Sequence, residues 1–199
     1  MKTTMIALTA ATLLVVTPTR AEEEEAGEKI VSVSPDKKFA VRIKYDPTST
    51  SAEEGQPEEI SRDATKAIEL VAMPSKEVVL NLMTEEGGLD GKGVWAQDSS
   101  WFAYALSLGQ RVTETRVCHR KEDSFEQLNT ENLYVDSGGD TRNQYIRPIK
   151  WLNPGTLVLE QMEIFRGGAG DSTLQFTVHF DKDGKFHVIS KKKVKSKRE

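Results

Sequence analysis

The sequence has little of the chemistry that most exported domains and most hydrolases use. Cys118 is its one cysteine, so no disulfide can form within the chain. It has three histidines, which limits the candidate zinc ligands and catalytic bases. No stretch shows the 3.6-residue apolar spacing of an amphipathic helix, and Gly-x-Ser-x-Gly does not occur. These absences exclude a disulfide scaffold and an α/β-type serine hydrolase.

The first 21 residues have the pattern of a secretory signal peptide. A short basic start precedes an uncharged apolar run from Met5 to Val16, and small residues, Thr19 and Ala21, stand where a signal peptidase reads. A membrane anchor is the alternative, but this run is shorter than the roughly 20 apolar residues that span a bilayer. We therefore expect cleavage after Ala21 and a periplasmic or secreted protein. Cleavage removes Lys2 and Arg20, so the mature chain is more acidic than the formal charge of −4 of the whole sequence. This balance argues against a nucleic-acid partner.

The ends of the mature chain carry opposite charges. Residues 22–29 are rich in glutamate and predict a solvated acidic tail. Residues 191–199 are rich in lysine and predict a basic tail, which is either solvated or in weak contact with an anionic surface.

Between these tails, residues 30–190 read as strands and turns. Phe39 to Tyr45 alternates apolar and polar residues, and Trp101 to Leu108 is a nearly continuous apolar run. Val33, Trp95 and Trp151 each precede a polar turn and a second apolar strand. When one polar insert is subtracted from each interval between these three positions, units of about 40–45 residues remain. Each unit has four predicted strands, and this length is typical of propeller blades. The sequence predicts an all-β fold of about three four-stranded antiparallel blades, at about 30–83, 93–128 and 145–190.

Two of these turns carry a recognisable motif. Ser34-Pro35-Asp36-Lys37-Lys38-Phe39-Ala40-Val41 and Trp95-Ala96-Gln97-Asp98-Ser99-Ser100-Trp101-Phe102-Ala103-Tyr104 resemble the TolB-type, WD-like propeller repeat, roughly W-S-P-D-G-K-x-[LI]-A-[FVY]. The repeat also occurs in the propeller domains of prolyl-oligopeptidase-type peptidases. The first copy lacks the Trp and the Gly, the second has Gln97 in place of Pro, and the third keeps Trp151 but lacks the turn Asp. The resemblance implies a fold and no particular function.

Three blades do not make a closed propeller, which typically has four to eight. Such an arc leaves a sheet face open at each end. Two solutions follow: loops and tails cap the open faces, or a homodimer closes a ring with twofold symmetry.

Most candidate sites have a structural explanation. Cys118 and His119 are neighbours on a predicted strand and point to opposite faces, so a buried inert thiol is expected. The glycines of Gly167 to Asp171 precede a strand, whereas a phosphate cradle needs a helix N-terminus. The three tryptophans at repeat positions indicate core between blades, with a stacking platform for ligands as the alternative.

His179 and His187 are predicted to sit across one hairpin. With a carboxylate of the turn Asp181-Lys182-Asp183-Gly184, they would form a zinc site. The same turn is first of all good hairpin chemistry, and it lacks the later Glu of an EF-hand loop. We therefore expect no metal and no cofactor.

These observations predict an exported, non-catalytic, propeller-like binding or scaffold protein of unidentified ligand. Its binding surface would be the loops Pro47 to Asp63 and Asn129 to Asn143, and its partner another envelope or secreted protein. The alternative is a small secreted hydrolase or metal-binding enzyme that uses loop carboxylates or the His179/His187 hairpin.

Overall fold

A computed structural model describes residues 26–49, 60, 63–83, 88–89 and 93–194. The described chain is built from strands and turns, with two short 3-10 turns at Pro47–Ser49 and Arg166–Gly168. The all-β class is therefore confirmed. Among the described residues, no helix has the length and apolar character that crossing a membrane requires.

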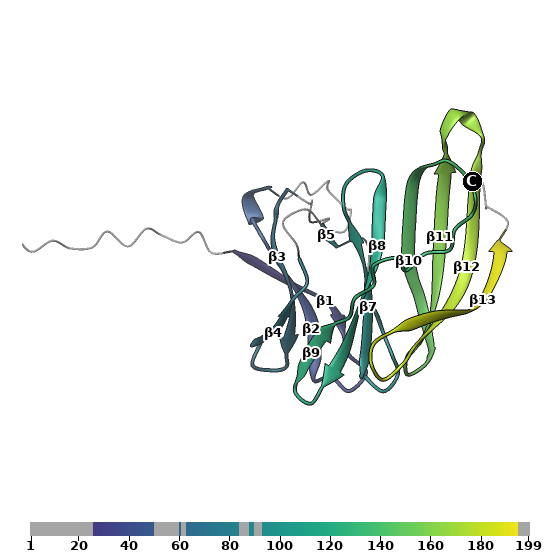
Figure 1. Ribbon diagram of the computed structural model, residues 1–199. Helices are drawn as coiled ribbons and strands as arrows, with labels where there is room; N and C mark the ends of the chain where they lie inside the picture. Colours follow the sequence, from purple (N-terminus) through teal and green to yellow (C-terminus); the bar gives the residue numbers. More distant parts are fainter. Residues whose placement is uncertain (1–25, 50–59, 61–62, 84–87, 90–92, 195–199) are drawn as a thin grey trace, which may run out of the picture.

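Three groups of strands lie side by side (Figure 1). The first group comprises β1 (Gly27–Val33), β2 (Phe39–Tyr45), β3 (Thr65–Ala72) and β4 (Val78–Asn81). The middle group comprises β6 (Val94–Trp95), β7 (Trp101–Ser107), β8 (Val112–Lys121) and β9 (Ser124–Gln127). The third group comprises β10 (Thr141–Asn153), β11 (Thr156–Phe165), β12 (Asp171–Phe180) and β13 (Phe186–Val194). A short extra strand, β5 (Gly88–Leu89), pairs with β7.

The hydrogen-bonded sheets differ from the expected three separate antiparallel ones. The first group is a four-stranded sheet by itself, whereas the middle and third groups join into one nine-stranded sheet. The junction is a short parallel ladder between β8 and β10, in which Gln144 and Tyr145 pair with Val112 and Thr113. All other pairs are antiparallel. β9 pairs with β8 only from Cys118 to Lys121. The same edge of β8 is therefore open at Val112 and Thr113, where β10 pairs with it.

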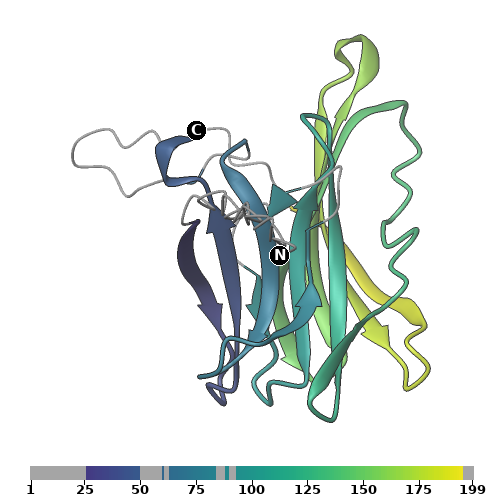
Figure 2. The ribbon, with the colours of Figure 1, turned by 90° about the vertical axis from the view of Figure 1, so that its left-hand side faces the viewer.

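Two apolar clusters hold the groups together. Figure 2 views the ribbon from the side of the first group, with the strands of the later groups behind it. One lies between the first and middle groups and contains Phe39, Val41, Ile68, Leu70, Leu82, Phe102, Tyr104, Leu106, Cys118 and Phe125. The other lies between the middle and third groups and contains Ala96, Trp101, Ala103, Val117, Leu128, Leu133, Ile146, Leu157, Leu159, Phe176, Val178 and Phe180. The middle group is therefore buried on both faces, which is why β7 is apolar almost throughout.

The first two repeated turns have the same backbone hydrogen bonds. Ser34 N donates to Phe39 O and Lys37 N to Ser34 O; in the second copy Ala96 N donates to Trp101 O and Ser99 N to Ala96 O. Lys37 and Ser99 both have φ near +60°, and Gly155 holds the corresponding place in the third turn with φ +75°. The sequence repeat is thus a repeat of backbone conformation.

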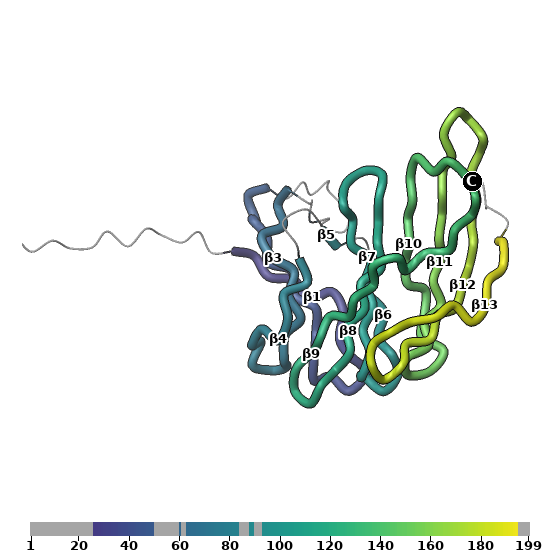
Figure 3. Tube along the Cα trace, viewed as in Figure 1, coloured from purple at the N-terminus to yellow at the C-terminus, as the bar shows by residue number. Residues whose placement is uncertain are grey.

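Two of the tryptophans, Trp95 and Trp151, each make a corresponding contact with the previous group. The indole N–H of Trp95 donates to Ser32 Oγ of β1 at 3.0 Å, and that of Trp151 donates to Val94 O of β6 at 3.1 Å. Ser32 and Val94 each precede the repeat position of their own group, so both tryptophans reach the corresponding place in the group before them. Figure 3 shows the three groups following one another along the chain, from purple to yellow. The repeat position of the first group is Val33, which is exposed.

The outer face of the first sheet carries an ion-pair network in place of an apolar cluster. Arg42, only 6% exposed, donates to Glu69 Oε2 from Nε at 2.9 Å and from Nη2 at 2.6 Å. Its Nη1 donates to Glu28 Oε1 at 3.1 Å, and Lys76 Nζ bonds the other oxygen of Glu28 at 2.9 Å. Lys44 lies 3.5 Å from Glu69. These charged side chains on the outer face of the first sheet are therefore paired with one another, and no further strand group of the described chain packs on this face.

Both ends of the folded region extend beyond the expected bounds of 30–190. β1 begins at Gly27, because Glu28 is held in the ion-pair network and does not belong to a solvated tail. β13 continues to Val194, since Lys191, Lys192 and Lys193 pair with residues of the long strand β12. The rest of the acidic and basic tails, and the expected signal peptide, lie outside the described residues.

Candidate functional site

A cavity of about 560 Å³ opens at the end of the molecule where all three strand groups meet. Its apolar wall is the exposed end of the cluster between the first and middle groups, formed by Val31, Ile43, Ile68 and Leu89. Its polar lining comes from all three groups and consists of Lys29, Thr65, Ser107, Gln110, Thr113, Tyr145 and Arg147. An apolar wall with a few converging polar groups is typical of a binding site for a small molecule or a chain segment.

The rim contributed by the third group is held to the middle group by side-chain contacts. The Tyr145 hydroxyl donates to Gln110 O at 2.9 Å and accepts from Asn143 Nδ2 at 2.6 Å. The Arg147 guanidinium lies 5.6 Å from the centre of the Tyr145 ring. Asn143, Tyr145 and Arg147 all lie on β10, so the bond from the Tyr145 hydroxyl to Gln110 O is the one of these contacts that reaches the β7–β8 turn and ties two walls of the cavity together.

The polar residues of this cavity were not predicted from the sequence. Lys29, Gln110 and Tyr145 lie in three different repeat units, and no local motif marks them. Only the stacking of the groups brings them to one place.

Groups with displaced pKa values lie elsewhere among the described residues. Hydrogen bonding by Lys76 lowers the pKa of Glu28, and burial raises that of Tyr104. Burial acts to raise the pKa of Asp36, but hydrogen bonds from Ser34, the Lys38 amide and Ser99 lower it overall. None of these groups lines the cavity, so the displaced titrations accompany packing and turn formation and give the cavity no acid–base pair.

Cys118 and His119 do not form a reactive pair. Cys118 is fully buried against the first group, and burial raises the pKa of its thiol to about 12. His119 lies on the opposite face, stacked on Trp101 with ring centres 4.1 Å apart, and burial lowers its pKa. The inert thiol predicted from the alternation of side chains agrees with this arrangement.

The three tryptophans pack in or against the two apolar clusters. Trp101 is 7% exposed, and Trp95 and Trp151 pack against the two apolar clusters. This packing favours core positions between the groups over a stacking platform for ligands. The Gly167–Asp171 loop is a short 3-10 turn that leads into β12, with positive φ at Gly167, Gly168 and Gly170. It does not precede a helix, as expected.

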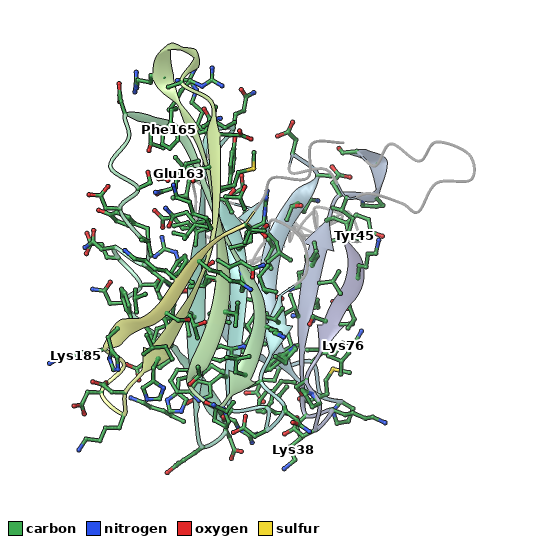
Figure 4. The ribbon with its side chains drawn as sticks, turned by 90° about the vertical axis from the view of Figure 1, so that its right-hand side faces the viewer. Lys38, Tyr45, Lys76, Glu163, Phe165 and Lys185 are labelled. Atoms are coloured by element: carbon green, nitrogen blue, oxygen red, sulfur yellow. The ribbon has the colours of Figure 1, made fainter. Side chains whose placement is uncertain are left out.

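The structure describes one of the two predicted binding loops and little of the other. Most of Pro47 to Asp63 lies outside the described residues. Asn129 to Asn143 packs against the third group: the Gln161 side chain, 1% exposed, accepts from Val135 N at 2.8 Å and donates to Val135 O at 2.7 Å. Glu163 and Phe165, labelled in Figure 4, lie on the same strand β11, at its far end. This loop therefore covers the inner face of the third group and does not line the cavity described above.

The sequence correctly places His179 and His187 opposite each other on one hairpin, and their ring centres are 5.5 Å apart. The Asp181 carboxylate turns inward to the hairpin, where Oδ1 accepts the N–H groups of Asp183 and Lys185. Across the described residues, no group of three or more His, Cys, Asp and Glu side chains is arranged to hold a metal ion. The three-ligand zinc site considered from the sequence is therefore not formed.

Comparison with protein-family models, with curated proteins and with solved structures gives no match to this chain.

Proposed function

We propose that this chain is an exported, non-catalytic binding or scaffold protein whose ligand enters the cavity between the three strand groups. The observation that carries the proposal is the composition of that cavity, which joins an apolar wall to hydrogen-bonding groups from every strand group. An occupant that touches all three groups buries apolar surface beside polar side chains of every group, as specific ligands do. The partner class is another envelope or secreted protein or a small molecule of that compartment.

The proposed architecture is a three-blade arc of the TolB-type, WD-like propeller kind. The equivalent turn hydrogen bonds and the two equivalent tryptophan contacts support it. Of the two ways to terminate the arc, capping is the better supported. A ring-closing partner would have to stack on the outer face of the first sheet, where Arg42 and Glu69 are already paired and Val33 replaces the tryptophan. A monomer mass in light scattering is the expected result, and a stable dimer would overturn capping.

The binding proposal is tested by filling the cavity mouth. Gln110 is exposed at the rim, so Gln110→Trp adds an aromatic ring there without disturbing the core. The matched control is Lys182→Trp, which adds the same ring to the exposed turn between β12 and β13. After incubation with envelope extract, native mass spectrometry should show an adduct on the wild type and on the control, and little on Gln110→Trp. Equal occupancy in all three proteins, or no adduct on the wild type, would contradict the proposal.

Export is tested separately by N-terminal sequencing of the protein recovered from the host. The expected new N-terminus is Glu22; a chain that keeps Met1 in the cytoplasm would contradict export.

A further inference from the structure

Two histidines share one face of the β12–β13 hairpin, away from the cavity. His179 and His187 are directly opposite each other in the ladder, and their ring planes meet at 65°. His179 is half-buried and His187 is exposed, so an ion can reach both rings from solvent. Figure 4 shows the turn that carries Lys185 at the edge of the molecule, beside these strands.

The hairpin fixes the spacing of the two rings. Asp181 N donates to Lys185 O at 2.8 Å, and Asp181 Oδ1 accepts from two amides of the turn. Phe180 and Phe186 pair just before and after the turn, with ring centres 5.9 Å apart. The backbone therefore holds the two imidazoles close before any ligand arrives, which lowers the entropy cost of chelation.

Thr156 orients one of the rings. Its Oγ1 lies 3.0 Å from Nδ1 of His179, and it projects from the neighbouring strand β11. When Nδ1–H donates to this oxygen, the lone pair stays on Nε2. Metal-bound histidines commonly have such an outer partner on the second ring nitrogen.

We infer that His179 and His187 bind one divalent transition-metal ion, with one nitrogen from each ring and water in the remaining positions. Two imidazoles that share a tetrahedral ion at about 2.0 Å from each nitrogen have ring centres roughly 5 Å apart, close to the observed separation. Two protein ligands are fewer than a structural zinc site uses, so the ion exchanges with solvent. Lys182 and Lys185 flank the turn and keep the affinity modest. Among ions, Cu²⁺ binds more tightly than Zn²⁺.

Calorimetric titration of the purified protein, without a histidine tag, with Zn²⁺ and then with Cu²⁺ tests the site. The wild type should bind one ion, and His187→Gln and His179→Gln should each weaken binding by more than the roughly 10- to 100-fold that loss of an outer partner costs. Thr156→Val should weaken it less than either histidine substitution. His119→Gln is the matched control and should leave the affinity unchanged.

Three results would overturn the inference. They are no binding to the wild type at millimolar ion, retained binding in the double variant of His179 and His187, or loss in one single variant only. Circular dichroism of each variant separates a lost ligand from a lost fold. The result bears on the metal site alone, because neither histidine lines the cavity.

Discussion

The first and middle groups share a strand order but differ in what their strands bury. β7 of the middle group is buried from Trp101 to Leu106, with successive side chains in different apolar clusters. β2 of the first group sends Val41 into a cluster and Arg42 into an ion-pair network on the other face. The position of a sheet in the stack thus decides whether its central strand is continuously apolar or alternating. The predictions below test this difference.

The largest effect is expected in the doubly buried group. Phe102 is fully buried between Trp95 and Tyr104, so Phe102→Ala should lower the free energy of unfolding by about 3–5 kcal/mol. Val78 lies on the outer face of the first sheet and is 46% exposed, so Val78→Ala should cost only about 0.5 kcal/mol. Urea unfolding measures both; similar costs would mean that the two faces are equally buried.

A smaller loss is expected where charge replaces packing. Arg42→Met leaves Glu69 buried without its two hydrogen bonds from Arg42, which should cost about 2–3 kcal/mol. The double variant Arg42→Met with Glu69→Leu should recover much of this stability, because no unpaired charge remains. It should also increase self-association in light scattering, since the face becomes apolar. A double variant as unstable as the single one would show that the unpaired charge of Glu69 is not the main cause of the lost stability.

The two stacking steps should respond alike to loss of an indole N–H. Trp95→Phe and Trp151→Phe each remove one hydrogen bond to the preceding group and should each cost at least about 1 kcal/mol. Thermal unfolding at one pH compares them directly. A large cost at one position and none at the other would contradict equivalent stacking.

The smallest effect concerns acid. Asp36 accepts a hydrogen bond from Ser34 and pairs with Arg120 of the middle group at 3.1 Å, and its pKa is lowered. Its contribution is therefore complete above the ordinary pKa near 4 and is lost as the pH falls through the lower folded value. Asp36→Asn should make the free energy of unfolding depend less on pH below about 4. Near neutrality the pH dependence should be the same in the variant and the wild type. Equal acid sensitivity of the variant, measured by urea unfolding across pH, would show that Asp36 does not contribute to it.

Local patterns predicted the strands well and the long-range contacts poorly. The alternation from Phe39 and the apolar run from Trp101 correctly predicted β2 and β7, because side-chain period is a local property. The strand at Lys191 to Val194 was read as a tail, since lysines on an edge strand resemble a solvated terminus.

The candidate site shows the same limit more strongly. Lys29, Gln110 and Tyr145 meet only after three groups have stacked, so their proximity has no local signal. The Gln161–Val135 pair, 26 residues apart, is equally invisible in the sequence, and it holds the 129–143 loop against the third group. The histidine pair was predicted because it lies across one short hairpin turn.

Trp95 and Trp151 each bond to the residue that precedes the repeat position of the group before them, and the stacking of the three groups depends on these two contacts. The most direct measurement is a ¹⁵N-edited NOESY spectrum, in which the three indole N–H groups give three resolvable signals. We expect cross-peaks from the Trp95 indole proton to Ser32 and from the Trp151 indole proton to Val94. Cross-peaks confined to each tryptophan's own strand group would contradict this expectation.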